Sequence, residues 1–341
     1  MHENQFALFD LDDETEEFPD LDSYSVIIIA CSGGKDSIAC LLHLLDSGAD
    51  PKRIELWHHC VDGERNGEYF MDWPVTEDYC KKLAEAFGIS IYFSWKLGGF
   101  RSEMLRDNEL TKPCQFETPE QGVLQAGGVS GKPNTRKVFP QVAASLSVRW
   151  CSSYLKIDVS QKAITNQLRF CNSKTLFVTG ERAQESSARA NYKVFEPHKA
   201  DNRNGKSKRH VDAYRPVHGW DESQVWEIIE RYKVNPHPAY RAGWGRLSCI
   251  SCIFGNADQW ASVRRVSPKQ FDEIAYYESQ FGKTIHRKHS VTELADKGKP
   301  YAAINDDLIA LGMAETFNEP MILDQWTLPA GAFGDSSTGP S

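Results

Sequence analysis

The chain has 341 residues, of which 40% are hydrophobic, and a formal net charge of −8 at pH 7. Its nine tryptophans and seventeen phenylalanines exclude a disordered chain and predict one large α/β domain, with or without a smaller appendage. No apolar run reaches the roughly 18 residues that a membrane-spanning helix needs, and the first residues lack the basic start and apolar stretch of a signal peptide. We therefore expect a cytoplasmic protein with no membrane partner.

The negative charge is concentrated in an acidic N-terminal arm. Residues 1–22 hold nine acidic residues and no lysine or arginine, which leaves 38 acidic and 39 basic residues in the rest of the chain. The overall charge alone would count against a polyanionic partner, but a nearly neutral body with a separate acidic arm does not. We predict that the arm is a solvated tail.

Strands and helices alternate at the start of the body. The β-branched run at residues 25–30 (SVIIIA) predicts a buried strand, and the apolar run at residues 38–45 predicts a helix after a glycine turn. A second strand is predicted at residues 53–58, a helix at residues 75–87 and a third strand at residues 89–95. This alternation predicts a parallel sheet covered by helices.

The pattern is interrupted between residues 98 and 140, where glycines and prolines are interleaved. Such a long loop is usually a lid, a substrate-binding excursion or a disordered segment. A helix is then predicted at residues 152–168, a buried strand at residues 174–180 and a helix capped by aspartate at residues 221–232. We expect four parts, namely an acidic arm (1–22), a nucleotide domain with the long loop (23–240), a helical region with a CxxC motif (241–328) and a disordered tail (329–341).

Residues 31–37 (CSGGKDS) lie where a phosphate-binding loop must lie, between a buried strand and the start of a helix. The two glycines let backbone amides approach an anion, the helix N-terminus adds a partial positive charge, and Lys35 adds a full one. Asp36 and Ser37 are placed to support a magnesium-bound triphosphate or its waters. The segment is not a Walker loop, because the G-x-x-x-x-G-K-[ST] pattern is absent. An ordinary strand–helix turn is the alternative.

The segment Ser32–Ser37 resembles the SGGxDS signature of the PP-loop ATP pyrophosphatases. Within them the chain is similar to the group that contains phosphoadenylyl-sulfate reductases, sulfate adenylyltransferase small subunits and DNA phosphorothioation ATP pyrophosphatases. The later segments that carry this resemblance are Arg149-Trp150-Cys151 with Leu155-Lys156, Gly180–Ser187 with Arg189, Arg215-Pro216 with Trp220, and Asn235–Tyr240. The resemblance covers residues 24–260 and implies an adenine nucleotide alpha-hydrolase-like α/β fold, a PP-loop parallel sheet of about five strands with flanking helices and a cysteine-containing helical C-terminal region.

The resemblance also implies ATP and Mg²⁺ as cofactors and cleavage of ATP between the α and β phosphates. It assigns the reaction to Lys35, Asp36 and Arg182. The other nucleotide-binding residues that it implies are Ser32, Gly33, Gly34, Ser37, Asp62, Lys156, Glu181 and Arg189. Arg182 and Asp62 follow predicted strands, and open parallel sheets bind ligands beyond the carboxyl ends of their strands. For Arg182 and Arg189 a surface salt bridge is the alternative.

Three of the nine cysteines form a candidate metal site, since a cytoplasmic chain does not predict a disulfide framework. Cys249 and Cys252 flank a CxxC turn, and Cys151 falls where the resembling iron–sulfur enzymes supply thiolates. Three cysteines suit a [4Fe–4S] cluster with one iron left open, whereas a zinc site, a redox pair and inert thiols are the alternatives. The candidates for a fourth ligand are Cys114, Cys171, His237 and an exogenous sulfur.

These features together predict an ATP pyrophosphatase for sulfur incorporation into nucleic acid, most specifically for phosphorothioation of the DNA backbone. The implied partners are DNA, a cysteine desulfurase and other modification-complex subunits, in a process that the resemblance links to phage defence. The basic segment 199–215 is a candidate for gripping phosphates.

The alternatives are a phosphoadenylyl-sulfate reductase, a tRNA thiolation enzyme, a sulfate adenylyltransferase small subunit and an ATP-binding regulatory protein with a structural metal. The resembling reductases attack with a cysteine in a C-terminal tail, and no cysteine follows Cys252. This absence counts against reduction.

Overall fold

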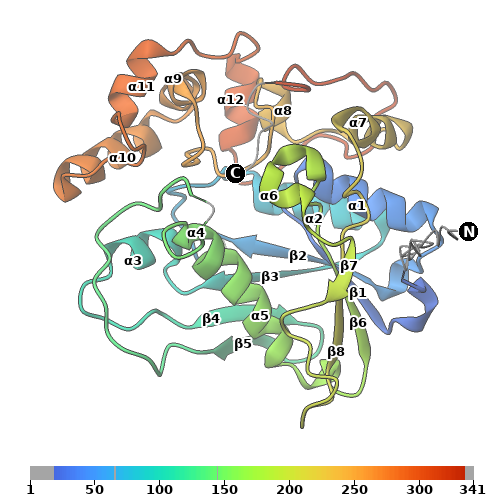
Figure 1. Cartoon of the computed structure of the whole chain (residues 1–341). Coiled ribbons are helices and arrows are strands. Elements are labelled where there is room, and N and C mark those ends of the chain that lie inside the picture. Colours follow the sequence, from blue (N-terminus) through green and yellow to red (C-terminus); the bar gives the residue numbers. More distant parts are fainter. Residues whose placement is uncertain (1–18, 65–66, 144, 335–341) are drawn as a thin grey trace, which may run out of the picture.

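Strand β1 lies near the middle of an eight-stranded sheet in the computed structural model, which describes residues 19–64, 67–143 and 145–334 (Figure 1). The expected acidic arm therefore falls outside the described residues except for residues 19–22. The strands are β1 (Val26–Ala30), β2 (Ile54–Cys60), β3 (Ser90–Lys96), β4 (Cys114–Thr118), β5 (Gly122–Ala126), β6 (Lys174–Val178), β7 (Phe195–Pro197) and β8 (His210–Tyr214).

The strand order is β5-β4-β3-β2-β1-β6-β8-β7. Strands β3, β2, β1, β6 and β8 are parallel to their neighbours, which confirms the expected parallel core. The hairpin β4–β5 extends one side of this core in antiparallel fashion, and β7 extends the other. All five parallel strands therefore end at the same edge of the sheet, which we call the carboxyl edge, and begin at the opposite edge, the amino edge.

Helices cover both faces of the sheet. This is expected because successive side chains of strand β1 point to opposite faces and are apolar on both. Ile27 and Ile29 pack in the large core together with helices α1, α2 and α7, whereas Ile28 packs on the other face with helix α5. The helices of the sheet region are α1 (Lys35–Asp46), α2 (Thr76–Phe87), α3 (Gly99–Leu105), α4 (Trp150–Ser152), α5 (Asp158–Thr165), α6 (Ser187–Ala190) and α7 (Glu222–Arg231). No helix among the described residues is long and apolar enough to cross a membrane.

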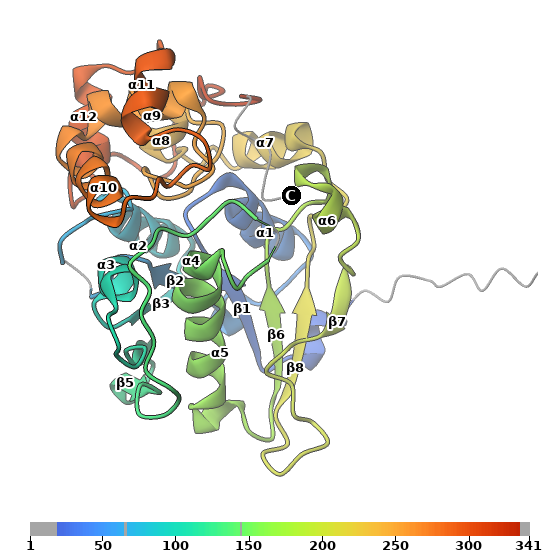
Figure 2. The ribbon, with the colours of Figure 1, turned by 60° about the vertical axis from the view of Figure 1, so that its left-hand side comes forward.

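The C-terminal region lies beyond the end toward which β6 and β8 point (Figure 2). Its helices are α8 (Pro238–Arg241), α9 (Ala257–Val266), α10 (Pro268–Phe281), α11 (Val291–Lys297) and α12 (Asp306–Met313). One hydrophobic cluster includes Ile27 of the sheet as well as Trp260 and Phe317 of this region. The C-terminal helices therefore share a core with the sheet and cover its carboxyl edge.

Two expectations from the sequence are wrong. The segment 98–140 is not one long loop, because it contains α3 and the hairpin β4–β5, whose Cys114 and Phe116 are buried. The segment 329–334 is not disordered, because the amide of Gly331 donates to the carbonyl of Tyr240 at 2.8 Å. The rest of the expected tail, residues 335–341, lies outside the described residues.

Candidate functional site

The phosphate loop joins β1 to α1 at the carboxyl edge, as predicted. Gly33 has φ +73°, and a Cβ atom there would lie 3.1 Å from Cys80 Sγ and 3.2 Å from the ring of Tyr79. Only glycine accommodates both the left-handed backbone and this close packing. Gly34 is the N-cap of α1 and leaves the first turn of the helix without a side-chain cap of its own. The start of α1 therefore presents its partial positive charge at this point, although the amide of Lys35 already donates to the hydroxyl of Tyr240.

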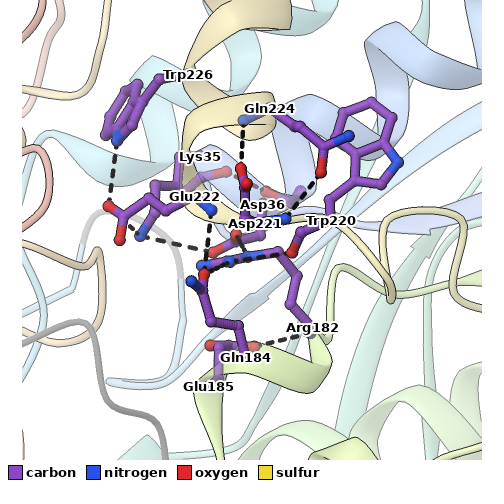
Figure 3. Close-up of polar contacts among 12 residues, drawn as sticks. Lys35, Asp36, Arg182, Gln184, Glu185, Trp220, Asp221, Glu222, Gln224 and Trp226 are labelled. Carbon is purple, nitrogen blue, oxygen red and sulfur yellow. Dashed lines mark hydrogen bonds and ion pairs between the residues drawn. The ribbon is translucent and has the colours of Figure 1, made fainter.

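Lys35 is a buried cation beside this helix start, with a relative exposure of 2%. Its ammonium donates to the carbonyl of Gly245 at 3.0 Å and lies 3.6 Å from Glu222 and 3.9 Å from Asp36 (Figure 3). Burial opposes its protonation, but the charges of Asp36 and Glu222 outweigh burial and raise the pKa of Lys35. The side chain therefore carries a full positive charge inside the protein at neutral pH.

Arg182 is a second buried cation and reaches the same carboxylate from the end of β6. Its Nε donates to Asp36 at 2.6 Å, and its Nη1 donates to the amide oxygen of Gln184 at 2.8 Å (Figure 3). Its exposure is only 1%. Burial lowers the pKa of Arg182, but Asp36 outweighs this effect and the net shift is upward. One carboxylate, that of Asp36, thus lies between two buried cations.

A cavity of about 320 Å³ opens beside Arg182. It is lined by Arg182, Gln184, Glu185, Asp221, Glu222, Ser223 and Phe333. Its wall holds one buried cation, Arg182, together with three acidic side chains, and no residue of the phosphate loop lines it. The backbone amide of Phe333 donates to Glu222 at 3.2 Å, so the C-terminal segment forms part of the wall.

Two residues of this site were not identified from the sequence. Glu222 is the counter-ion of Lys35, although the two residues lie far apart in the chain. The hydroxyl of Tyr240 accepts the amide of Lys35 at 3.0 Å and the amide of Leu247 at 3.0 Å, and it thereby caps the start of α1. Tyr240 was part of the family resemblance, but nothing local predicts this contact.

The other expected nucleotide-binding residues lie around this centre rather than in it. Ser32 and Ser37 belong to the loop itself, and the hydroxyl of Ser37 donates to the carbonyl of Gly34. Glu181 pairs with Arg215 at 2.9 Å, and Arg189 pairs with Glu185, which lines the cavity. Arg189 therefore reaches the wall of the site only through Glu185, whereas Arg215, the partner of Glu181, does not line the cavity.

Asp62 lies apart from the cavity and holds a loop together. Its carboxylate accepts the amides of Phe70, Met71 and Asp72 at 2.8–3.1 Å. Burial raises the pKa of Asp62 to about 7 and that of Asp72 to about 6. The amide of Ser251 donates to the carbonyl of Met71, so this loop packs against the CxxC turn. A contact of Asp62 with a nucleoside remains a prediction.

Cys151 and Lys156 lie in an irregular helix near the CxxC turn. A π-helix at Ser153–Ile157 joins α4 to α5, and π turns occur frequently at functional sites. The exposed Lys156 acts electrostatically on Asp72 and Cys151. Burial raises the pKa of Cys151 to about 11, and Cys252 adds to that shift. Burial is also the main cause of the raised pKa of Cys249.

The three cysteines are neighbours, but they do not form a closed ligand set. Among the described residues, no group of three cysteine, histidine or acidic side chains is close enough together to hold a metal ion. Two of the candidate fourth ligands are engaged elsewhere. His237 contacts the hydroxyl of Thr76 and the amide of Ala239, and Cys114 lies beside Asp158. Cys171 precedes β6 and therefore lies at the amino edge.

The basic segment 199–215 does not approach the phosphate loop. Its residues 210–214 form β8, which is parallel to β6, so the loop 199–209 lies at the amino edge (Figure 2). Arg203 pairs with Asp201 at 2.9 Å and with Asp212 at 2.5 Å, and Arg209 donates to the carbonyl of Ala200. The loop 199–209 therefore lies at the opposite edge of the sheet from the phosphate loop, and its gripping of phosphates stays a prediction.

Comparisons with known proteins place the site in a family context. Residues 129–254 match the model of the phosphoadenosine phosphosulfate reductase domain. The chain is 32% identical over 263 residues to an uncharacterized 37.8 kDa protein in the gpa 5′ region of Escherichia phage 186, over 74% of this chain and 75% of that protein. A solved structure of Candida glabrata FMN adenylyltransferase with FMN and the ATP analog AMPCPP is 12% identical, with a TM-score of 0.35 over 93% of this chain and 80% of that one.

Proposed function

Because the chain belongs to the family of the uncharacterized phage 186 protein and contains a phosphoadenosine phosphosulfate reductase domain, we propose that it acts on an adenine nucleotide in sulfur chemistry. The specific proposal is an ATP pyrophosphatase that activates a nucleic acid for sulfur incorporation, with the DNA backbone as acceptor. A cysteine desulfurase and other subunits of a modification complex would be its partners.

One observation carries this proposal, namely that Lys35 and Arg182 converge on Asp36 at the start of α1. Both cations are buried, and charges in a low-dielectric site act more strongly than in water. Negative charge grows on the leaving pyrophosphate as the α–β bridge of ATP breaks. Preorganised cations at that position lower the barrier without reorganisation. Two fixed cations beside a helix N-terminus are therefore suited to this step.

In the proposed reaction an acceptor phosphate oxygen attacks the α-phosphorus of ATP and the bond to the bridging oxygen breaks. Pyrophosphate leaves, and the acceptor becomes adenylylated. The terminal sulfur of a persulfide donor (R–S–S⁻) then attacks the acceptor phosphorus and displaces AMP. A second thiol cleaves the resulting P–S–S–R bond, which releases the phosphorothioate and leaves the donor sulfur in a disulfide with that thiol. Lys35 and Arg182 bind the departing phosphates. Mg²⁺ would enter with the triphosphate and neutralise part of its charge, with Asp36 as its proposed protein ligand.

Cys151, Cys249 and Cys252 are the proposed ligands of an iron–sulfur cluster, or else they relay sulfur. Thiolates are suitable ligands for iron. Among the described residues, however, these three side chains do not form a group that could hold a metal ion, and no step of the reaction is assigned to a cluster. Anaerobic purification followed by iron and sulfide analysis tests the assignment. A colourless protein without iron refutes the cluster.

Reduction of phosphoadenylyl sulfate is the second candidate, because the matched domain bears that name. The chain has no cysteine after Cys252 to attack the sulfonate. Release of sulfite from phosphoadenylyl sulfate would support this candidate, whereas release of pyrophosphate from ATP supports the first one.

The main experiment compares pyrophosphate release by the wild type and by Lys35→Ala. We expect a loss of about 100-fold or more, because the variant removes one of the two cations at the leaving group. Lys206→Ala, at the amino edge, is the matched control and should retain wild-type activity. Retained pyrophosphate release in Lys35→Ala would refute the assignment of the loop. Mass spectrometry of DNA and tRNA from cells with and without the protein identifies the acceptor.

A further inference from the structure

One half-exposed aromatic ring, that of Tyr192, lies against Arg215 and shares a helical turn with Arg189. We define the Tyr192 face as Arg149, Arg189, Tyr192, Arg215 and Arg246. The ring of Tyr192 is 39% exposed, and the guanidinium carbon of Arg215 lies 5.1 Å from its centroid. The amide of Tyr192 donates to the carbonyl of Arg189 at 2.9 Å, so the two residues share one turn.

The arginines of this face act on one another. Burial is the main cause that lowers the pKa of Arg149, and the positive charges of Arg189 and Arg246 lower it further. Tyr192 acts on the same guanidinium. Arg149 therefore lies among the other members of the face, although it comes from a distant part of the chain.

The positive charge of the face is only partly compensated. Arg215 pairs with Glu181 and Glu196, and Arg189 pairs with Glu185. Arg149 has no ion pair with any described residue, and its Nε is buried without a hydrogen-bond partner among them. An unpaired guanidinium favours an anionic ligand, because an unsatisfied buried donor costs free energy until it finds an acceptor.

The ring of Tyr192 is held as a platform. Arg215, which lies against the ring, is fixed by Glu181, by Glu196 and by a hydrogen bond to the carbonyl of Lys193 at 2.6 Å. A ring that is supported from one side and exposed elsewhere offers a surface on which another flat group can stack at little entropic cost.

The face connects the nucleotide cavity with the cysteines. Glu185, the partner of Arg189, lines the cavity and accepts the backbone amide of Arg182 at 2.9 Å. At the other side, Cys151 acts electrostatically on Arg149. A chain of phosphates across the face would therefore run from the reacting end of a bound nucleotide toward the thiols.

We propose that the Tyr192 face binds an unpaired segment of nucleic acid, with phosphates on Arg149, Arg189 and Arg246 and one base stacked on Tyr192. The proposal rests on the proposed function and supplies its acceptor site. Stacking on an aromatic ring is possible only for a base that is not paired within a duplex, and arginines along a backbone provide affinity without sequence preference. The proposed occupant is single-stranded DNA, the acceptor of the proposed function, and preferential binding of RNA is an outcome of the test.

Fluorescence anisotropy with labelled dT12, U12 and a 12-base-pair DNA duplex tests the proposal in the absence of ATP. The wild type should bind a single strand at least fivefold more tightly than the duplex. Tyr192→Ala should weaken single-strand binding roughly tenfold, whereas Tyr192→Phe should stay within about twofold, because it retains the stacking ring. Arg149→Ala should also lower the slope of log K against log salt by about 0.7, the value for one phosphate contact on a single strand.

The double variant Lys206→Ala/Lys208→Ala is the control for a general loss of positive charge, since it removes two exposed lysines from the loop at the amino edge. It should bind the single strand as the wild type does. The inference is overturned if this control loses affinity while Tyr192→Ala retains it, or if the wild type prefers the duplex. It is also overturned if adenosine 3′,5′-bisphosphate competes fully and affinity does not change between dT2 and dT12, because the face would then be a mononucleotide site.

The proposed function and this inference fail in different experiments. Lys35→Ala should lose pyrophosphate release but bind dT12 normally. A wild type that releases no pyrophosphate yet binds single strands through Tyr192 contradicts the function alone. A wild type that releases pyrophosphate but does not distinguish Tyr192→Ala from Tyr192→Phe contradicts the inference alone. The relative affinities for dT12 and U12 then separate a DNA acceptor from an RNA acceptor.

Discussion

The two edges of the sheet hold positive charge in opposite ways. At the amino edge, Arg203 of the basic loop pairs with Asp201 and Asp212, so its charge is used within the fold. At the carboxyl edge, Lys35 and Arg182 share the carboxylate of Asp36. The loop 199–209, which is rich in lysine and arginine, is thus less suited to binding an anion. Acidic partners are present at both edges, since Glu222 also pairs with Lys35. What distinguishes the carboxyl edge is that its two cations are buried and converge at the start of a helix, which a count along the sequence does not give.

The pKa values of acidic residues are also shifted in opposite directions at the two edges. At the amino edge, burial opposes ionisation of Asp212, but hydrogen bonds from Arg203 and Tyr24 outweigh it and lower the pKa of Asp212. At the carboxyl edge, burial dominates and raises the pKa of Asp62 to about 7. The amino edge is therefore built for stability, whereas the carboxyl edge retains groups that titrate near neutral pH.

Replacing one ion-paired arginine at each edge gives the largest contrast. Arg182→Ala should lower kcat/KM for pyrophosphate release by about 10²–10³, because it removes a fixed donor from the leaving group. Arg203→Ala should leave kcat/KM within about twofold of the wild type. Steady-state kinetics with ATP and an oligonucleotide acceptor measures both values. Equal losses in the two variants would show that the edges do not differ in function.

Within the amino edge, an ion-paired arginine and an exposed lysine should contribute differently to the free energy of unfolding. Arg203→Ala should reduce the free energy of unfolding by about 2 kcal/mol, because Asp212 is left buried without its main cationic partner. Lys206→Ala, in the same loop, should change it by no more than about 0.5 kcal/mol. Urea denaturation followed by tryptophan fluorescence measures both. A loss in Lys206→Ala as large as that in Arg203→Ala would contradict the role given to the ion pair.

The central strand and the phosphate loop could be predicted from the sequence because their causes are local. The β-branched run of β1 is buried on both faces, and Gly33 occupies a backbone conformation that favours glycine. The hairpin β4–β5 escaped prediction because its inward residues, Cys114 and Phe116, are few and stand among many glycines and prolines. Its short strands lie at the edge of the sheet, where only one face of each strand is buried and few apolar residues are needed.

The centre of the site was predicted only in part, for a related reason. Recognisable motifs contain Lys35, Asp36 and Arg182. Glu222, in contrast, contacts Lys35 only after the chain has folded. The nearest local signal was the cap at Asp221, which fixes the start of α7 and so places Glu222. For the loop 199–209 part of the signal was present, since Asp201 lies two residues from Arg203, whereas Asp212 lies nine residues away. Their pairing was underestimated because a list of charges does not specify distances.

The smallest expected effect is a change in the pH dependence of stability, and it again differs between the two edges. The folded-state pKa of Asp62, about 7, is raised above its usual value near 4, so the folded chain binds an extra proton between these values. Stability from this group is therefore present at low pH and is lost as pH rises through 7. Asp62→Asn keeps an acceptor oxygen for the loop amides but cannot ionise. It should reduce the loss of stability between pH 5 and pH 7 by roughly 1 kcal/mol, with Asp72 still titrating.

Asp212→Asn is the matched variant at the amino edge. The pKa of this carboxyl group is shifted in the opposite direction from that of Asp62. The pKa of Asp212 is lowered in the folded chain, so its contribution is present above the unfolded pKa and is lost only as pH falls through the folded value. This variant should be destabilised at pH 7 without a change in slope between pH 5 and pH 7. Urea unfolding at four pH values between 5 and 8 measures both slopes. An unchanged slope in Asp62→Asn would mean that the carboxylate of Asp62 is ionised throughout this range, so that the two edges hold their acids alike.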